Sequence, residues 1–159
     1  PKLIFLDEPT VAVDPQSRNA ILEGIVKLNK AGATIVYTSH YMEEVEQICD
    51  RIVILDKGKI IAKGTKESLK EMTAMGERIV IEMAKPDKKI MAEFEKMPNL
   101  LEAKYDDGKL TLTFARGKEK LPSVIEFLKK NELSYERIFS ELPSLNDVFL
   151  ELTGKELRD

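Results

Sequence analysis

The sequence contains little cysteine, few aromatic residues and no long apolar run. Its single cysteine, Cys49, cannot support a disulfide framework, so we expect a reducing compartment. The longest uninterrupted apolar run has four residues, whereas a membrane-spanning helix needs about 20, so we expect these residues to form no span. A large excess of one charge is also absent, since 25 Lys+Arg oppose 28 Asp+Glu. This balance argues against a chain built to bind nucleic acid.

The 159 residues are 43% hydrophobic, which is typical of a globular protein with one or two small domains. Residues 1–75 show apolar strand-like runs that alternate with helical spacing, which predicts an α/β layer with parallel strands. The expected elements are strand 3–6, helix 16–30, strand 34–38, helix 41–49, and hairpin strands 51–56 and 59–63. The run at 3–6 is continuous, which favours a strand buried on both faces.

The pattern changes near residues 75 and 76. A helix capped by Thr65 is expected to end at Gly76, and the order β-α-β-β-α-β follows. The elements expected here are strand 78–83, helix 87–97, strands 101–105 and 109–114, helix 121–130, strand 134–139 and a last helix from 144. We therefore predict an α+β ferredoxin-like domain over residues 76–159.

Two adjacent carboxylates, Asp7 and Glu8, stand where the first strand ends. Ligands of open α/β sheets bind at the carboxyl ends of strands, and paired carboxylates repel each other unless a cation or substrate uses them. A bare Asp-Glu pair is nevertheless more often a solvated acidic turn. The same comparison applies to His40, the only histidine of the chain, which directly follows strand 34–38. A lone histidine is more often structural, but a position at a neighbouring strand end favours ligand contact.

The flanking residues decide between these alternatives. The chain reads LIFLDEPT from position 3, VDP from position 13 and YTSH from position 37. These three motifs, in this order and spacing, resemble the ATP-binding subunit of ABC transporters from its Walker B strand onward. The resemblance covers about the first 64 residues. Three motifs in order are far more specific than any one of them.

The resemblance implies a role for each of four residues. Asp7 would hold Mg²⁺, through water, and Glu8 would be the base or the group that orients the attacking water. Asp14 would be the D-loop carboxylate, and His40 would contact the γ-phosphate. ATP and Mg²⁺ are therefore the implied cofactors, and the implied activity is that of a P-loop ATPase.

Two family motifs do not occur within these residues. No segment matches the phosphate loop G-x-x-x-x-G-K-[ST], and no two glycines are adjacent, as the signature loop would require. We therefore interpret residues 1–75 as the C-terminal part of the nucleotide-binding domain, a partial P-loop NTPase sheet that lacks the Walker A half. We expect negligible ATP affinity for these residues alone, and a partner chain or swapped element over part of this region.

The segment 143–154 resembles the C-terminal extension of export-type ABC ATPases. It implies a subunit that exports drugs, antibiotics or ions together with a separate transmembrane permease and a second ATPase subunit in a homodimer. The implied location is the cytoplasm, at the inner face of the cell membrane. It also makes a dimerisation or regulatory role plausible for residues 76–159.

The leading hypothesis is thus the ATP-hydrolysing subunit of an ABC exporter. A non-catalytic dimerisation or regulatory module is the alternative. A DNA-repair ATPase of the same superfamily is a third hypothesis, disfavoured because the chain has no coiled-coil heptads.

Overall fold

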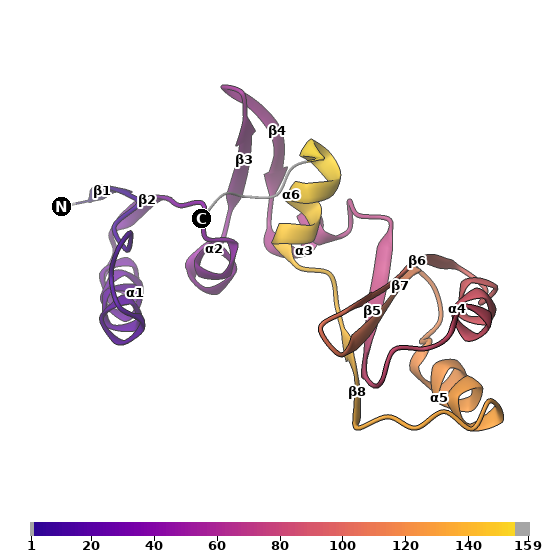
Figure 1. Ribbon diagram of the computed structural model, residues 1–159. Coiled ribbons are helices and arrows are strands. Elements are labelled where there is room, and N and C mark those ends of the chain that lie inside the picture. The colour runs from indigo at the N-terminus through magenta and orange to yellow at the C-terminus, as the bar shows by residue number, and fades with distance from the viewer. Residues whose placement is uncertain (1, 155–159) are drawn as a thin grey trace. The chain divides into compact units, whose positions relative to one another are not determined.

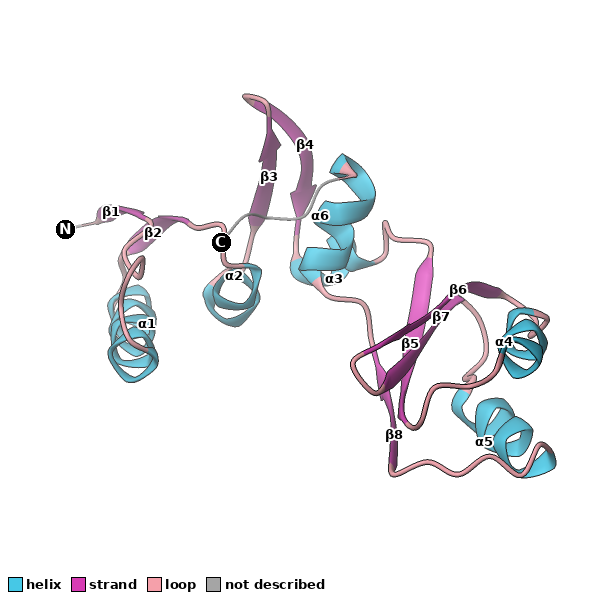
Figure 2. Cartoon of the chain, in the orientation of Figure 1, coloured by secondary structure: helices cyan, strands magenta, loops and turns pink. Residues whose placement is uncertain are grey.

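A computed structural model describes residues 2–154 of the chain, which form a mixed α/β protein with two compact units (Figure 1). Unit 1 contains the residues up to Lys70 together with those from Leu145 on, and unit 2 contains Glu71–Ser144. Figure 2 shows that helices and strands are mixed in both units. Within the described residues, no helix is both long and apolar enough to pass through a bilayer.

Unit 1 begins with two parallel strands and a connecting helix. Strand β1 (Leu3–Asp7) pairs in register with β2 (Thr34–Thr38), and α1 (Pro15–Lys30) joins them. The predicted parallel pairing is confirmed. The predicted burial on both faces is not seen, because alternate residues of each strand are exposed and Phe5 is 71% accessible.

The rest of unit 1 is a second sheet with three helices. Helix α2 (Met42–Ile48) leads to the antiparallel pair β3 (Ile52–Asp56) and β4 (Lys59–Gly64), as the Lys57-Gly58 turn predicted. Both turn residues have positive φ, which suits a tight two-residue hairpin. Two further helices complete this part, namely α3 (Lys66–Lys70) and α6 (Leu145–Thr153).

Helix α6 belongs to the core of unit 1, although the sequence analysis assigned it to the domain 76–159. Its fully buried residues Leu145 and Val148 pack in one cluster with five side chains from α2, β3, β4 and α3. These five are Val45, Ile52, Ile54, Ala62 and Leu69. The apolar stripe predicted the helix correctly but could not tell which of two cores it covers.

Unit 2 is a four-stranded antiparallel sheet in the order β6-β7-β5-β8. Its strands are β5 (Met75–Glu82), β6 (Leu100–Asp106), β7 (Lys109–Ala115) and β8 (Arg137–Glu141), and its helices are α4 (Lys88–Glu95) and α5 (Leu121–Lys130). The predicted succession of these elements is present. The Asp107-Gly108 turn has positive φ at both residues and joins β6 to β7.

The core of unit 2 lies between the sheet and the two helices, which cover the same face (Figure 1). Alternate residues of β5 and β7 are fully buried there, against Phe94 of α4 and against Val124 and Leu128 of α5. This period of two is what a sheet with one covered face requires.

We predicted that Gly76 ends a helix, but it lies inside β5. Helix α3 already ends at Lys70, and the pairing of β5 with β7 shifts register between Met75 and Glu77. A Cβ atom at Gly76 would lie 2.7 Å from the Cα of Arg116. Glycine is required here because the two backbones approach closely at an irregularity of the sheet.

Candidate functional site

Asp7 and Glu8 lie at the carboxyl end of β1, beside the end of β2. Asp7 pairs with Thr38 in the ladder, and its carboxylate accepts a hydrogen bond from the Thr38 hydroxyl. The backbone N–H of Glu8 donates to the Thr38 carbonyl at 2.9 Å, so the contact between the strands continues one residue beyond β1. The two carboxylates are thereby held at the sheet edge where α/β proteins bind ligands.

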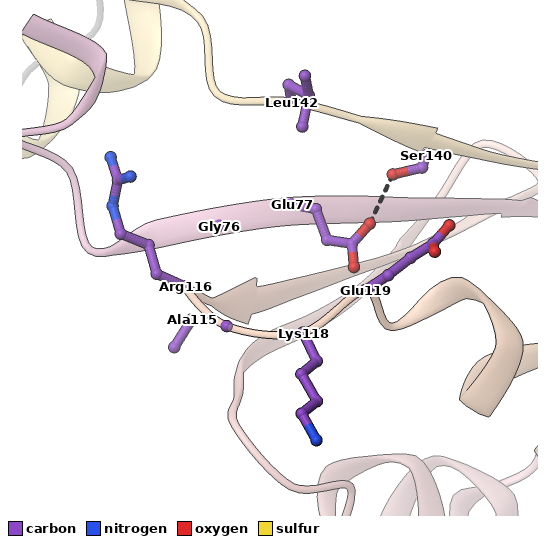
Figure 3. A pocket seen from close by; sticks show the side chains of 9 residues that line it. Gly76, Glu77, Ala115, Arg116, Lys118, Glu119, Ser140 and Leu142 are labelled. Atoms are coloured by element: carbon purple, nitrogen blue, oxygen red, sulfur yellow. Dashed lines mark hydrogen bonds between the residues drawn. The ribbon is translucent and has the colours of Figure 1, made fainter. Parts of the chain in front are cut away.

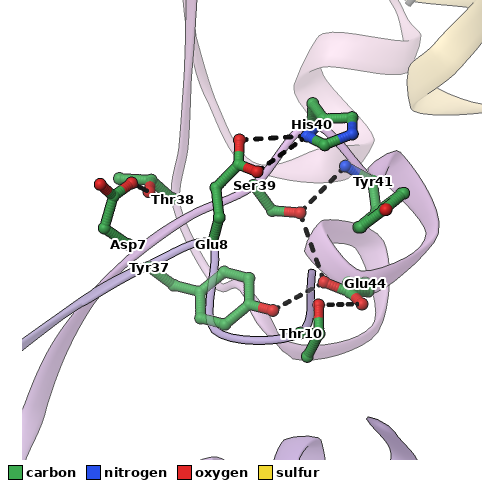
Figure 4. Close-up of polar contacts among 9 residues, drawn as sticks. All are labelled: Asp7, Glu8, Thr10, Tyr37, Thr38, Ser39, His40, Tyr41 and Glu44. Carbon is green, nitrogen blue, oxygen red and sulfur yellow. Dashed lines mark hydrogen bonds and ion pairs between the residues drawn. The ribbon is translucent and has the colours of Figure 1, made fainter. Parts of the chain in front are cut away.

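Glu8 and His40 contact each other directly (Figure 4). The His40 Nδ1 atom lies 3.0 Å from Oε1 and 3.1 Å from Oε2 of Glu8. An ionised carboxylate only accepts hydrogen bonds, so this contact requires a proton on Nδ1. The geometry thus unites two residues that stand 32 positions apart in the sequence.

The turn that carries Glu8 has an uncommon backbone conformation. Glu8 has φ 46° and Ala12 has φ 60°, both in the left-handed region that side chains usually avoid. The Glu8 carbonyl accepts from the N–H of Val11 at 3.3 Å, which closes the turn. Such conformations persist only where the surrounding structure enforces them, and they gather at functional sites.

Asp14 is the N-cap of α1 and accepts from the Ser17 backbone N–H at 3.0 Å. This hydrogen bond lowers the pKa of the exposed Asp14 carboxyl below its ordinary value. Among the described residues, no hydrogen bond or ion pair joins it to Asp7, Glu8 or His40. Of the four predicted site residues, the structure therefore connects Glu8 with His40 and leaves Asp14 apart from them.

The most heavily bonded carboxylate near this site is one that the sequence analysis did not select. Glu44 of α2 is only 3% accessible, and it accepts hydrogen bonds from the hydroxyls of Thr10 and Tyr37, both at 2.6 Å, and of Ser39 at 3.3 Å (Figure 4). Burial and the bond to Glu44 raise the pKa of Tyr37 to about 12. One signal was available, because Glu44 stands four residues before the inward-facing Ile48 on the same helix.

The donor set at this edge fits a magnesium ion that is shared with phosphates. No group of three or more His, Cys, Asp or Glu side chains within residues 2–154 could hold a metal by itself. Magnesium usually keeps several waters and takes only one or two carboxylates together with substrate phosphates. Asp7, which is bonded to the Thr38 hydroxyl, could supply one such carboxylate.

Unit 2 has a hollow of about 460 Å³ at one end of its sheet, lined by residues of β5, β7, β8 and the loop before α5 (Figure 3). The Glu77 carboxylate there accepts from the Lys120 backbone N–H and, at 2.7 Å, from the Ser140 hydroxyl. The Arg116 Nε atom donates to the Thr73 carbonyl at 2.8 Å. These bonds tie together the strands and the loop at this end, and the hollow contains none of the predicted site residues.

Comparison with known proteins identifies the family. The C-terminal domain of DrrA1-3-like ATP-binding proteins matches residues 64–153. The chain therefore belongs to this family of ATP-binding proteins of ABC transporters, as the strand-end motifs predicted.

Several curated relatives match the whole chain or nearly so. The linearmycin resistance ATP-binding protein LnrL of Bacillus subtilis (strain 168) is 35% identical over 100% of this chain and 52% of that protein. The daunorubicin/doxorubicin resistance ATP-binding protein DrrA of Streptomyces peucetius is 32% identical over 100% of this chain and 48% of its own length. The Nod factor export ATP-binding protein I of Ralstonia nicotianae is 32% identical over 100% of this chain and 49% of its own length.

The chain thus spans about half the length of the curated relatives it matches. Among solved structures, an ATP-binding subunit of an ABC transporter is 35% identical, with a TM-score of 0.42 over 45% of this chain and 30% of that one. A likeness of this extent carries no argument of its own.

Proposed function

We propose that this chain is part of the ATP-hydrolysing subunit of an ABC exporter, which couples hydrolysis to transport through a separate transmembrane permease. The observation that carries the proposal is the contact between Glu8 and His40 at the carboxyl ends of paired parallel strands. Family membership and the names of the relatives, which concern drug resistance and export, support the same activity.

Glu8 is the group that orients the attacking water or accepts its proton. A general base has to reach its proton within about 2.6–3.2 Å, directly or through one water. The side chain of Glu8 is 40% accessible, and both of its carboxylate oxygens lie near the Nδ1 atom of His40. This bond fixes the direction of the Glu8 carboxylate and leaves it able to receive a proton.

His40 contacts the γ-phosphate. While the Nδ1–H of His40 donates to Glu8, Nε2 can donate to a phosphate only if the ring carries protons on both nitrogens. Otherwise, the ring has to release Glu8 first. Either route makes the pair a unit in which the state of one side chain depends on the other.

Asp7 would hold Mg²⁺, through water, beside the phosphates of ATP. The metal neutralises charge on the transferred phosphoryl group, and this chemistry leaves positioning as the main task of the protein. The Thr38 hydroxyl orients Asp7 for this role. Asp14 is proposed as the D-loop carboxylate, and its cap on α1 supports an ordered loop between Glu8 and that helix.

We further propose that the predicted domain 76–159, without α6, forms a ferredoxin-like unit for dimerisation or regulation. The strand order β6-β7-β5-β8 with two helices on one face supports the fold. The subunit works as a homodimer on the cytoplasmic face of the membrane. Residues 1–75 contribute a partial P-loop NTPase sheet without the Walker A half, so we propose that this chain alone does not bind ATP.

The deciding experiment is Glu8→Gln in the full-length protein. We expect ATP hydrolysis to fall at least about 10²-fold, because a neutral amide cannot accept the proton. ATP binding should persist, and the dimer should be trapped in the ATP-bound state. Hydrolysis and nucleotide affinity are measured together. Glu43→Gln in α2 is the control, because it changes the charge by the same amount. Normal turnover in Glu8→Gln would remove Glu8 from its role.

Titration calorimetry of this chain with Mg-ATP tests the proposal that it does not bind ATP. We expect no binding heat, and micromolar binding would contradict the proposal. Hydrolysis of ATP by the full-length protein separates the proposed function from the alternative, a non-catalytic dimerisation or regulatory module, which predicts no hydrolysis.

A further inference from the structure

Glu44 is a buried carboxylate for which the proposed chemistry has no direct use. It is one of three buried polar residues in the described part of the chain, together with Thr10 and Thr73. Burying a charged group costs several kcal/mol unless hydrogen bonds and opposite charge compensate it. The contacts that Glu44 makes must therefore compensate the cost of its burial.

Those contacts reach three segments, namely the turn after β1, helix α1 and the end of β2. Oε1 accepts from the Thr10 hydroxyl at 2.6 Å and lies 3.4 Å from the Arg18 Nε atom of α1. Oε2 accepts from the Tyr37 hydroxyl of β2 at 2.6 Å and from the Ser39 hydroxyl at 3.3 Å. Because the Tyr37 pKa is raised to about 12, this hydroxyl remains a donor throughout the working pH range.

Two of the donors stand next to the proposed catalytic pair. Thr10 lies two residues after Glu8 in the same turn, and Ser39 immediately precedes His40. The Ser39 oxygen also accepts from the Tyr41 backbone N–H at 2.9 Å, so the segment around His40 is bonded on both sides. In Figure 4, the side chain of Glu44 lies between these two segments.

The turn at Glu8 has its own need for support. Glu8 has φ 46°, in the left-handed region, and a conformation of this kind relaxes when its surroundings allow it. Without Glu44, the buried Thr10 hydroxyl loses its acceptor and the turn is free to shift. The Glu8–His40 contact at 3.0 Å then loses the geometry that a general base requires.

We propose that Glu44 is a positioning residue for ATP hydrolysis, which holds the turn bearing Glu8 and the segment bearing His40 at a fixed mutual distance. This inference rests on the proposed function. It assigns Glu44 no contact with the nucleotide or the reacting atoms, and its effect reaches the reaction through Thr10 and Ser39.

Glu46 supplies a matched control on the same helix. Its carboxylate accepts from the Lys70 ammonium at 3.0 Å and from the Leu145 backbone N–H at 2.6 Å, so it ties α2 to α3 and α6. Both glutamates therefore support the packing of α2, but only Glu44 contacts the segments that carry Glu8 and His40. A role in stability alone would make the two variants behave alike.

The test compares Glu44→Ala and Glu46→Ala in the full-length protein, at a temperature where circular dichroism shows both to be folded. We expect Glu44→Ala to lower kcat by about 10–100-fold with little change in KM for ATP, because a displacement of about 1 Å can cost that much. Glu46→Ala should lower the melting temperature but keep the wild-type kcat. Thr10→Val should lower kcat in the wild-type background and have no further effect in Glu44→Ala.

Equal kcat values for Glu44→Ala and the wild type, or equal losses in both alanine variants, would overturn the proposal. If Glu44→Ala does not fold, Glu44→Gln replaces it, since this variant keeps the volume and one accepting oxygen. A reduced kcat at an unchanged KM then supports positioning, and a wild-type kcat overturns it. Glu8→Gln, measured alongside, separates the two failures: if it hydrolyses ATP normally, the proposed function itself is wrong.

Discussion

Unit 1 and unit 2 differ in how completely they bury their apolar residues. Unit 2 places the inward residues of its sheet and two helices in one core, most of which is fully buried. Unit 1 divides its strands into two pairs, and Leu3, Phe5 and Val36 on one face of the first pair are exposed.

The distribution of polar contacts is the reverse. The buried carboxylate Glu44, the Glu8–His40 pair and the strained turn at Glu8 all belong to unit 1. The best-bonded carboxylate of unit 2, Glu77, joins strands and a loop. The proposed site residues and the most complete apolar core of this chain therefore lie in different units, so mutations should separate activity from stability.

The largest effect is expected from Phe94→Ala, which removes a fully buried ring from the centre of unit 2. We expect a loss of about 3–5 kcal/mol in the free energy of unfolding of this unit. Hydrogen exchange resolved by peptide should show faster exchange in β5 and β7, with β1 and β2 unchanged. Leu101→Ala, at an exposed position of β6, is the control. Equal loss of protection in both units would refute their independence.

Leu145→Ala tests the assignment of α6 to unit 1. Leu145 is fully buried in the cluster with Leu69 and Val45, so we expect a loss of about 2–5 kcal/mol. Protection should fall in β3, β4 and α2, with β5 to β8 unaffected. The partly exposed Leu152 of the same helix provides the control variant Leu152→Ala. Destabilisation confined to unit 2 would restore α6 to the domain 76–159.

His40→Ala should affect the reaction and leave the stability of both units nearly unchanged. His40 is partly exposed, and its contact with Glu8 is the main one that the variant removes. We expect turnover in the full-length protein to fall about 10²-fold, as for the loss of one donor to a developing charge, with nucleotide affinity largely kept. Steady-state kinetics and a binding titration check this. If His40→Ala still hydrolyses ATP at the normal rate, the proposed contact of His40 with the γ-phosphate is wrong.

The smallest effect concerns Asp14, the cap of α1. Asp14→Ala should lower the melting temperature slightly at pH 7, whereas Asp14→Asn should not, since asparagine also caps helices. The pKa of Asp14 is lowered in the folded protein. The ionised carboxylate therefore stabilises the folded state at pH values above its ordinary pKa of about 3.9. This contribution is lost as the pH falls through the folded pKa. A constant difference between wild type and Asp14→Asn from pH 7 to pH 3 would contradict it.

Local patterns in the sequence predicted most of the elements and two of the residues that meet. The pairing of β1 with β2 followed from the strand–helix–strand spacing, and the Lys57-Gly58 and Asp107-Gly108 hairpins followed from their turn residues. Asp7, Glu8 and His40 were selected because they stand at the ends of predicted strands, within motifs that resemble those of ABC ATPases. The roles of these residues stay predictions until the variants are measured.

Other features depended on contacts between distant positions. The stripe of α6 fits either core equally well, and only packing decided that Leu145 covers unit 1. Gly76 looked like a helix stop because the 2.7 Å approach to Arg116, 40 positions later, leaves no local signal. Glu44 was not selected from the sequence, because its hydrogen-bond donor Thr10 stands 34 positions away.

The family, the succession of strands and helices, and the candidate site residues could therefore be predicted from the sequence, since each prediction depends on neighbours along the chain. Contacts in the folded chain were needed to show which core α6 joins, why β5 needs a glycine, and that Glu44 connects the segments of Glu8 and His40. The physical reason is that burial and hydrogen bonding depend on which groups meet in space. Residues as far apart as Thr10 and Glu44 meet only once the chain has folded.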